Sequence, residues 1–360
     1  MHEIEEALAP SNGIRLSARE WVAVTVVTVV ACALTPQAWS DDDPGSGASG
    51  YRVPHELNND YWFFEEVVER GVAEADVVAF GDSVIWGAYV KKDETLSGRL
   101  SSSGVRVANL GLQGAHPAAL AGLIEHHASA VRDKGVILHC NLLWMSSVRH
   151  DLRQEKEFLF NHPELVPQLD PWIPCYKAPL SERIGNVVRR NVRFLQWTRH
   201  LQYAFFDHLD VPSWTVEHPD DNPLARLRMP IPLPTDTPLE RPLRWDDRGI
   251  RPQAFSWVDL DESLQWQEFR RALRVLRDRG NRVFVLVGPF NEHLVTAASL
   301  PSYAVLKRQV VAWLTDQGIP HAAPAALRSE LYADASHPLA EGYARLASML
   351  LAAGSLEGIK

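Results

Sequence analysis

A short apolar run that ends in Gly81-Asp82-Ser83 constrains the fold of this chain more than any other feature. Residues 76–80 (DVVAF) are mostly apolar and rich in β-branched side chains, which is typical of a buried strand. A buried strand that stops at such a triplet brings a serine hydroxyl to the carboxyl edge of a sheet, where ligands bind in open α/β folds. A serine becomes a nucleophile only beside a base, so this pattern predicts a base elsewhere in the chain.

The best candidate for that base is His337, which follows Asp334 by three residues in a polar loop. A carboxylate at this spacing can orient the imidazole ring and leave its second nitrogen free to accept the serine proton. Pro338 is expected at the first position of a following helix. His293 also follows an apolar strand and is a competing base, but no aspartate stands three residues before it.

Strands and helices alternate on both sides of this region. Strands are expected at about 105–109, 135–139, 282–287 and 319–322, and helices at about 56–73, 117–132, 263–279 and 303–314. Gly111 and Gly114 bracket a tight loop after one strand, and Asn141 follows another. This alternation predicts an α/β fold with a parallel sheet and helices on both faces.

Four short motifs resemble those of the SGNH (GDSL-type) hydrolase family. They are Gly81-Asp82-Ser83, Asn109-Leu110-Gly111-Leu112-Gln113-Gly114, Asn141, and Asp334-x-x-His337. The third motif departs from the usual Gly-x-Asn-Asp, because this chain has His139-Cys140-Asn141-Leu142. The resemblance covers roughly residues 74–150 and 280–352.

The resemblance implies a flavodoxin-like three-layer sandwich with a central parallel sheet, the SGNH hydrolase fold. It also implies a catalytic triad of Ser83, His337 and Asp334. The expected oxyanion hole consists of the N–H groups of Ser83 and Gly114 and the side-chain amide of Asn141.

Composition excludes several classes of function. A formal charge of −9 with no basic block argues against a nucleic-acid partner. Adjacent residues of a helix do not share a face, so Glu125-His126-His127 does not predict a metal site. The glycine loop lacks the lysine of a phosphate-binding loop, and no cofactor is expected. Three cysteines show neither metal nor disulfide spacing, although Cys140 and Cys175 could pair in an oxidising compartment.

An uncharged apolar stretch, residues 21–39, is long enough to cross a bilayer. Arg15 and Arg19 precede it and three aspartates follow it, so the positive-inside rule places residues 1–20 in the cytoplasm and the body outside. A retained signal anchor, a cleaved signal peptide and a lipoprotein all remain open. A buried core element is the alternative that involves no membrane.

The rest of the chain divides into a linker and one body. Residues 40–55 begin with a Gly/Ser/Asp-rich stretch and are expected to be flexible, and 56–355 form the hydrolase-like domain. A proline-rich stretch, about 142–258, is expected to be an insertion that shapes the substrate cleft, or a peripheral decoration. Its tryptophans either stack on sugar faces or simply pack: Trp172, Trp197, Trp214 and Trp245.

These features together predict a serine esterase or acyl hydrolase on the cell membrane, with its catalytic domain in the periplasm or outside the cell. The expected substrate is an acylated carbohydrate or a small ester, with O-acyl groups of extracytoplasmic glycans as the first candidate. Two alternatives stay open. One is an O-acyltransferase acting on cell-surface polysaccharide, and the other is an inactive glycan-binding or assembly protein on the same fold.

Overall fold

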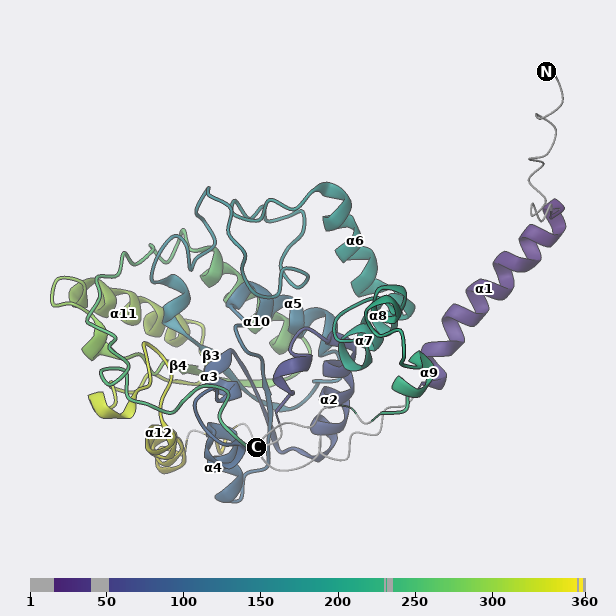
Figure 1. The fold of residues 1–360 in the computed structure, drawn as a ribbon. Helices are drawn as coiled ribbons and strands as arrows, with labels where there is room; N and C mark the ends of the chain where they lie inside the picture. The colour runs from purple at the N-terminus through teal and green to yellow at the C-terminus, as the bar shows by residue number, and fades with distance from the viewer. Residues whose placement is uncertain (1–15, 40–51, 230, 232–235, 355, 359–360) are drawn as a thin grey trace.

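The computed structural model consists of an α/β body and one long helix that projects from it (Figure 1). It describes residues 16–39, 52–229, 231, 236–354 and 356–358. Most of the expected cytoplasmic segment 1–20, most of the expected linker 40–55 and several prolines near 230–235 lie outside these residues.

The body is built around a parallel sheet, which has five strands in the described part of the chain. Its strands are β1 (Val77–Gly81), β2 (Val107–Gly111), β3 (Gly135–Cys140), β4 (Arg282–Val287) and β5 (His321–Ala322). The order is β2-β1-β3-β4-β5, and every neighbouring pair is parallel. This is the order of flavodoxin-like sheets, in which the strand order reverses between β1 and β3 and ligands bind at the carboxyl ends of these strands.

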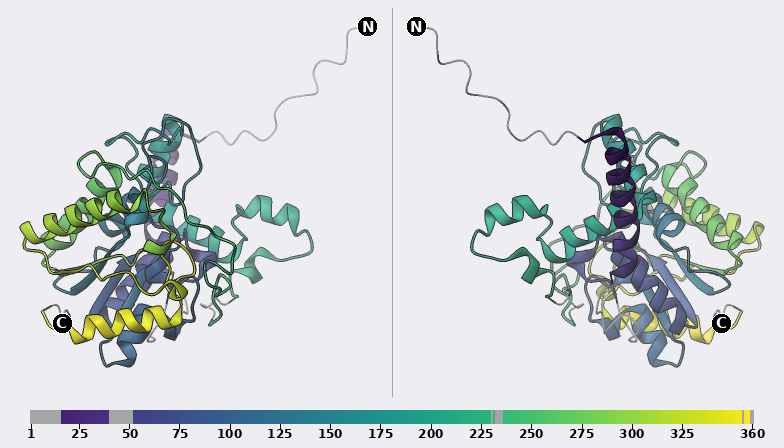
Figure 2. Two further views of the ribbon diagram at one scale, coloured as in Figure 1. Left: turned by 90° about the vertical axis from the view of Figure 1, so that its left-hand side faces the viewer. Right: turned by 90° about the vertical axis from the view of Figure 1, so that its right-hand side faces the viewer.

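Helices cover both faces of the sheet and make three layers (Figure 2). Val78 and Phe80 of β1 pack on the face covered by α2 (Tyr61–Glu74), α5 (Pro117–His127), α10 (Leu264–Asp278) and α11 (Leu300–Asp316). Val77 and Ala79 pack on the opposite face, under α4 (Leu96–Ser102) and α12 (Ala340–Ala352). Successive side chains of a strand point to opposite faces, so a run that is apolar throughout predicts a sheet buried on both sides. The predicted α/β fold with a parallel sheet is therefore confirmed.

Three predicted boundaries were wrong. The helix expected to begin at residue 56 begins at Tyr61. The helix expected to reach Arg132 ends at His127. Pro338 is not the first residue of a helix, because α12 begins at Ala340 with Leu339 as its N-cap. Tyr332 and Pro338 form an isolated antiparallel bridge, and the Leu339 N–H donates to the Leu331 carbonyl, so the chain stays extended up to Leu339.

The segment between β3 and α10 contains helices but no strand among its described residues. Its main elements are α6 (Leu180–Asn191) and α7 (Arg193–Phe205), followed by α8 (Val211–Glu217) and α9 (Pro223–Arg226). Helices α6 and α7 are separated at Val192, which has extended backbone angles. Trp214 and Trp245 are buried and pack in the core, whereas Trp172 is exposed.

The apolar N-terminal stretch is one helix, α1 (Ala18–Ala38). Ser17 and Glu20 form a capping box at its start. The helix is long and apolar enough to cross a membrane, and almost all of it is exposed. Its carboxyl end contacts α7, where the Trp39 ring lies 5.7 Å from that of Trp197 and 6.1 Å from that of Phe205.

The remaining elements are short helices that connect these parts. They are η1 (His55–Leu57), α3 (Ser83–Trp86), η2 (Lys92–Glu94), η3 (Leu142–Met145), η4 (Glu292–Leu294) and η5 (Ser329–Leu331).

Candidate active site

Ser83 is the first residue of α3, directly after β1. Asp82 caps this helix: its Oδ1 accepts a hydrogen bond from the Val84 N–H at 3.0 Å. The other end of α3 is held by Arg52, whose buried guanidinium donates to the Gly87 and Val90 carbonyls at 2.7 and 3.1 Å. The serine hydroxyl is therefore fixed at the carboxyl edge of the central strand.

His337 reaches Ser83 from the loop before α12. The His337 Nε2 lies 2.8 Å from the Ser83 Oγ, although the two residues are 254 positions apart. On the other side of the ring, Nδ1 lies 2.8 and 2.9 Å from the two carboxylate oxygens of Asp334. The structure thus brings together the three residues that the sequence pattern selected as a triad.

The loop that carries Asp334 and His337 is tied to the end of β4. Asn291, after β4, donates its backbone N–H to the Ala335 carbonyl at 2.8 Å and its side-chain amide to the Asp334 carbonyl at 3.1 Å. The Ala333 N–H donates to the His337 carbonyl at 2.9 Å and closes the turn. Asn291 is a positioning residue that the sequence pattern did not single out.

The charges in this loop favour an oriented, basic imidazole. Burial alone would raise the pKa of Asp334, but the His337 charge and three hydrogen bonds outweigh it and hold that pKa well below its usual range. Burial alone would lower the pKa of His337, but the charges of Asp334 and Asp82 and the Asp334 hydrogen bond raise it. The Asp334 carboxylate therefore accepts from Nδ1, which leaves Nε2 to face the serine.

Asp82 is a buried carboxylate next to Ser83 in sequence. Its Oδ2 accepts hydrogen bonds from Asn141 Nδ2 at 2.7 Å and Trp144 Nε1 at 2.9 Å. His139 Nδ1 lies 3.2 Å from Oδ1. Burial acts to raise the pKa of Asp82, but the contact with His139, the charge of His337 and the Asn141 hydrogen bond lower it to about 2. Asp82 thus links the ends of β1 and β3 as an anion.

Two backbone N–H groups after the ends of β1 and β2 have no acceptor within the described residues. Within the described residues, neither Ser83 nor Gly114 donates its N–H to another group. Gly114 has a φ of +75°, and a Cβ built on it would lie 2.0 Å from Asn161 Nδ2, so no larger residue fits there. These are the two backbone donors that were expected in the oxyanion hole.

Asn161 is a polar residue at this site that the sequence analysis missed. Its carbonyl lies 3.1 Å from His116 Nε2, while His116 Nδ1 accepts from the Ala119 N–H. Burial lowers the pKa of His116 to about 3, so the ring is neutral and Nε2–H donates to Asn161. Spacing along the chain carries no signal for Asn161, because it comes from a loop within the segment between β3 and α10.

Asn141 lies at the end of β3, but its amide is already engaged. Nδ2 donates to Asp82, and Oδ1 accepts from the Leu143 N–H at 3.0 Å. An amide nitrogen carries two hydrogens, so one remains for a ligand. The expected role of Asn141 in the oxyanion hole therefore rests on that second hydrogen.

The other candidate residues have separate partners. His293 Nε2 lies 3.0 Å from the Leu327 carbonyl, and His127 pairs with Glu65. No group of three metal-binding side chains occurs in the part of the chain that the structure describes. Cys140 and Cys175 are buried and are not bonded to each other.

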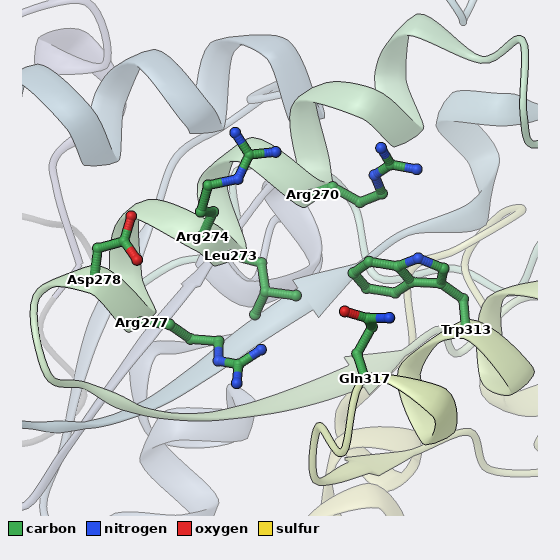
Figure 3. Close-up of a pocket in the computed structure, with 7 residues that line it drawn as sticks. All are labelled: Arg270, Leu273, Arg274, Arg277, Asp278, Trp313 and Gln317. Carbon is green, nitrogen blue, oxygen red and sulfur yellow. The ribbon is translucent and has the colours of Figure 1, made fainter.

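A recess of about 540 Å³ lies on the outer side of the body between α10 and α11 (Figure 3). It is lined by Arg270, Leu273, Arg274, Arg277, Asp278, Trp313 and Gln317. It contains no residue of the Ser83–His337–Asp334 group, so it is a separate feature of the surface.

Comparison with known proteins leaves the site to be interpreted from its geometry: no protein-family model and no curated protein matches this chain. The geometry supplies a hydroxyl, a base in contact with it, a carboxylate that orients the base, and two unused N–H donors. This is the set of groups that acyl transfer through serine requires.

Proposed function

We propose that this chain is a serine esterase that cleaves ester-linked acyl groups, anchored to a membrane by α1. One observation carries the proposal: the Ser83 Oγ lies 2.8 Å from the Nε2 of a histidine whose Nδ1 contacts the Asp334 carboxylate. A serine has no unusual reactivity without such a base, and the contact is within the range for proton transfer.

The first half-reaction forms an acyl-enzyme. His337 Nε2 takes the Ser83 proton as Oγ attacks the ester carbonyl carbon, and the carbonyl oxygen becomes an oxyanion. The imidazolium is stabilised by Asp334. As the tetrahedral intermediate collapses, the C–O bond to the alcohol breaks, and His337 returns the proton to the leaving oxygen.

The oxyanion would be stabilised by the N–H groups of Ser83 and Gly114 and by the second hydrogen of Asn141 Nδ2. One such donor typically lowers the barrier by about 3 kcal/mol. The three come from the ends of β1, β2 and β3, so the sheet holds them in place before substrate arrives.

The second half-reaction releases the acyl group. His337 takes a proton from water as the water oxygen attacks the acyl carbon; the C–Oγ bond then breaks, His337 returns the proton to Oγ, and a free carboxylic acid and Ser83 result. A sugar hydroxyl in place of water would give acyl transfer instead. The geometry of the triad is the same for both acceptors.

The proposed substrate class follows from the proposed location. If α1 spans the membrane as the arginines before it suggest, the body lies outside the cytoplasm, where acylated glycans are exposed. O-acyl groups on such glycans are therefore the first substrates to test, and small esters are their surrogates.

The experiment is turnover of p-nitrophenyl acetate by the full chain in detergent, compared between wild type, Ser83→Ala and the control Ser348→Ala, an exposed residue of α12. The proposal predicts loss of turnover only in Ser83→Ala. Equal rates in wild type and Ser83→Ala would overturn it. Addition of a sugar acceptor then separates the two outcomes, since a transferase gives acylated sugar and a hydrolase gives free acid.

A further inference from the structure

The helix α6 buries its polar side and exposes its apolar side, unlike an ordinary surface helix. Its polar residues Arg183 and Asn186 are buried, with 1% and 4% of their surface exposed, whereas Leu180, Ile184 and Val188 are 62%, 48% and 43% exposed. These three apolar residues are spaced four apart and lie on one side of the helix. A helix in water normally presents the reverse arrangement.

Hydrogen bonds on the buried side of α6 fix the orientation of this helix. The Arg183 guanidinium donates to the backbone carbonyls of Gln168, Tyr176 and Ala178, and the Asn186 amide donates to the Gln168 and Tyr176 side chains. Rotating the helix to bury its apolar side would break all of these bonds. The exposed apolar side is therefore a fixed feature of the fold.

A second helix of the same protein provides the contrast. In α10 the apolar residues Phe269, Leu273 and Leu276 are buried, while Arg274 and Arg277 face outward, as Figure 3 shows for the two arginines. Both helices are amphipathic, so the difference lies in what each one faces. The side that α6 presents is suited to an apolar environment.

The helix that is long and apolar enough to cross a membrane, α1, lies close to α6 (Figure 1). Figure 1 and the right-hand view of Figure 2 place α1 and α6 on the same side of the body. The carboxyl end of α1 packs on α7 through Trp39, and α7 follows α6 after Val192. Exposed Val192 and Leu195 continue the apolar side of α6 toward that contact. A bilayer around α1 would meet this surface.

We propose that the apolar side of α6 docks into the surface of the membrane that α1 crosses. We call this surface, formed by Leu180, Ile184, Val188, Val192 and Leu195, the α6 stripe. An amphipathic helix binds a bilayer by burying its apolar side at the boundary between headgroups and acyl chains. The inference uses α1 as an anchor, and so rests on that part of the proposed function.

Docking would also orient the active site. The carbonyls that Arg183 holds belong to residues 168–178, and the Tyr176 ring packs against Phe160 at 5.5 Å. Asn161 follows directly and lies against Gly114. Leu159, 98% exposed, stands in the same loop. These contacts connect α6 to the loop that reaches Gly114, so docking of the α6 stripe would fix the orientation of that loop relative to the bilayer.

The test measures lipid contact at single positions of the full chain in liposomes. An environment-sensitive NBD fluorophore is attached to Ile184→Cys, to Val27→Cys within α1, or to Met349→Cys, an exposed apolar position of α12. Cys32→Ala removes the half-exposed native thiol, and burial raises the pKa of the Cys175 thiol to about 11 and raises that of Cys140 further, so both stay protonated. Nitroxide-labelled lipids quench fluorophores that contact the bilayer.

We expect quenching at positions 184 and 27 to exceed that at position 349 severalfold, with a blue-shifted emission at 184. The variant Leu180→Ser/Val188→Ser should weaken the quenching at 184 and leave it unchanged at 27. Quenching at 184 no greater than at 349 would overturn the proposal, and so would a blue shift at 184 without lipid quenching, which would indicate a protein partner or a second copy. If position 27 were also unquenched, the anchor would be wrong, whereas ester turnover is measured separately and would be unaffected.

Discussion

The edge that carries Ser83 and the region beneath α6 both bury polar side chains, but they use them differently. Under α6, the bonds of Arg183 and Asn186 end on carbonyls and side chains of the same region. At the sheet edge, Asp82, Asp334 and His337 are equally well bonded, yet the Ser83 hydroxyl and the N–H groups of Ser83 and Gly114 remain available to a ligand. Buried polar side chains therefore indicate a catalytic site only where a nucleophile and hydrogen-bond donors remain available to a ligand.

This comparison predicts that the two regions respond differently to substitution. Changes at the sheet edge should reduce activity and leave folding intact, whereas changes beneath α6 should reduce stability. The predictions below follow the size of the expected effect.

Ser83→Ala removes the nucleophile and should lower kcat/KM for small esters by about 10⁶-fold, as loss of a triad serine does in other enzymes. The side chain is small and its hydroxyl contacts His337, so the melting temperature should stay within about 2 °C of wild type. Turnover assays and thermal melts on the same preparation measure both. Substantial unfolding of this variant would show that the Ser83 side chain is needed for stability rather than for catalysis alone.

Asp334→Asn tests the carboxylate that orients the base. An amide at this position no longer favours the tautomer with Nδ1–H, so kcat should fall by about 10⁴-fold. The control is Asp246→Asn. Asp246 is exposed and pairs with Arg244 at the surface, so this variant should show wild-type turnover. Equal activities of the two variants would contradict the assigned role of Asp334.

Arg183→Ala should destabilise the protein by about 3 kcal/mol, because it leaves several buried carbonyls without donors. Ile184→Ser, one residue further along α6, should change stability by less than about 0.5 kcal/mol because the side chain is already exposed. Chemical denaturation in detergent compares them. A larger loss in Ile184→Ser would show that the α6 stripe is covered within the protein itself.

The pH dependence of turnover should report the charge on His337. Only the neutral ring accepts the serine proton, so kcat/KM should rise with pH through the pKa of His337, which Asp334 and Asp82 raise above 6.5. Asp82→Asn removes one of these charges and should move the midpoint to lower pH. A midpoint unchanged in Asp82→Asn would show that Asp82 acts on geometry alone.

Local sequence signals predicted the strands and the three residues of the candidate triad. Each of them stands at the end of an apolar run or in a short motif, and parallel strands bring their carboxyl ends to one edge. Asn161 and Asn291 gave no such signal because their roles depend on contacts with distant segments. Periodicity could not show which side of α6 is buried, since it is the same in either orientation.

The central claim is that Ser83 is a nucleophile activated by His337. The most direct measurement is covalent labelling of the full chain by a fluorophosphonate, with the modified peptide located by mass spectrometry, in wild type and in His337→Ala. The account predicts a single adduct on Ser83 in wild type and a loss of labelling of several orders of magnitude in His337→Ala. No adduct on Ser83, or equal labelling in both proteins, would contradict it.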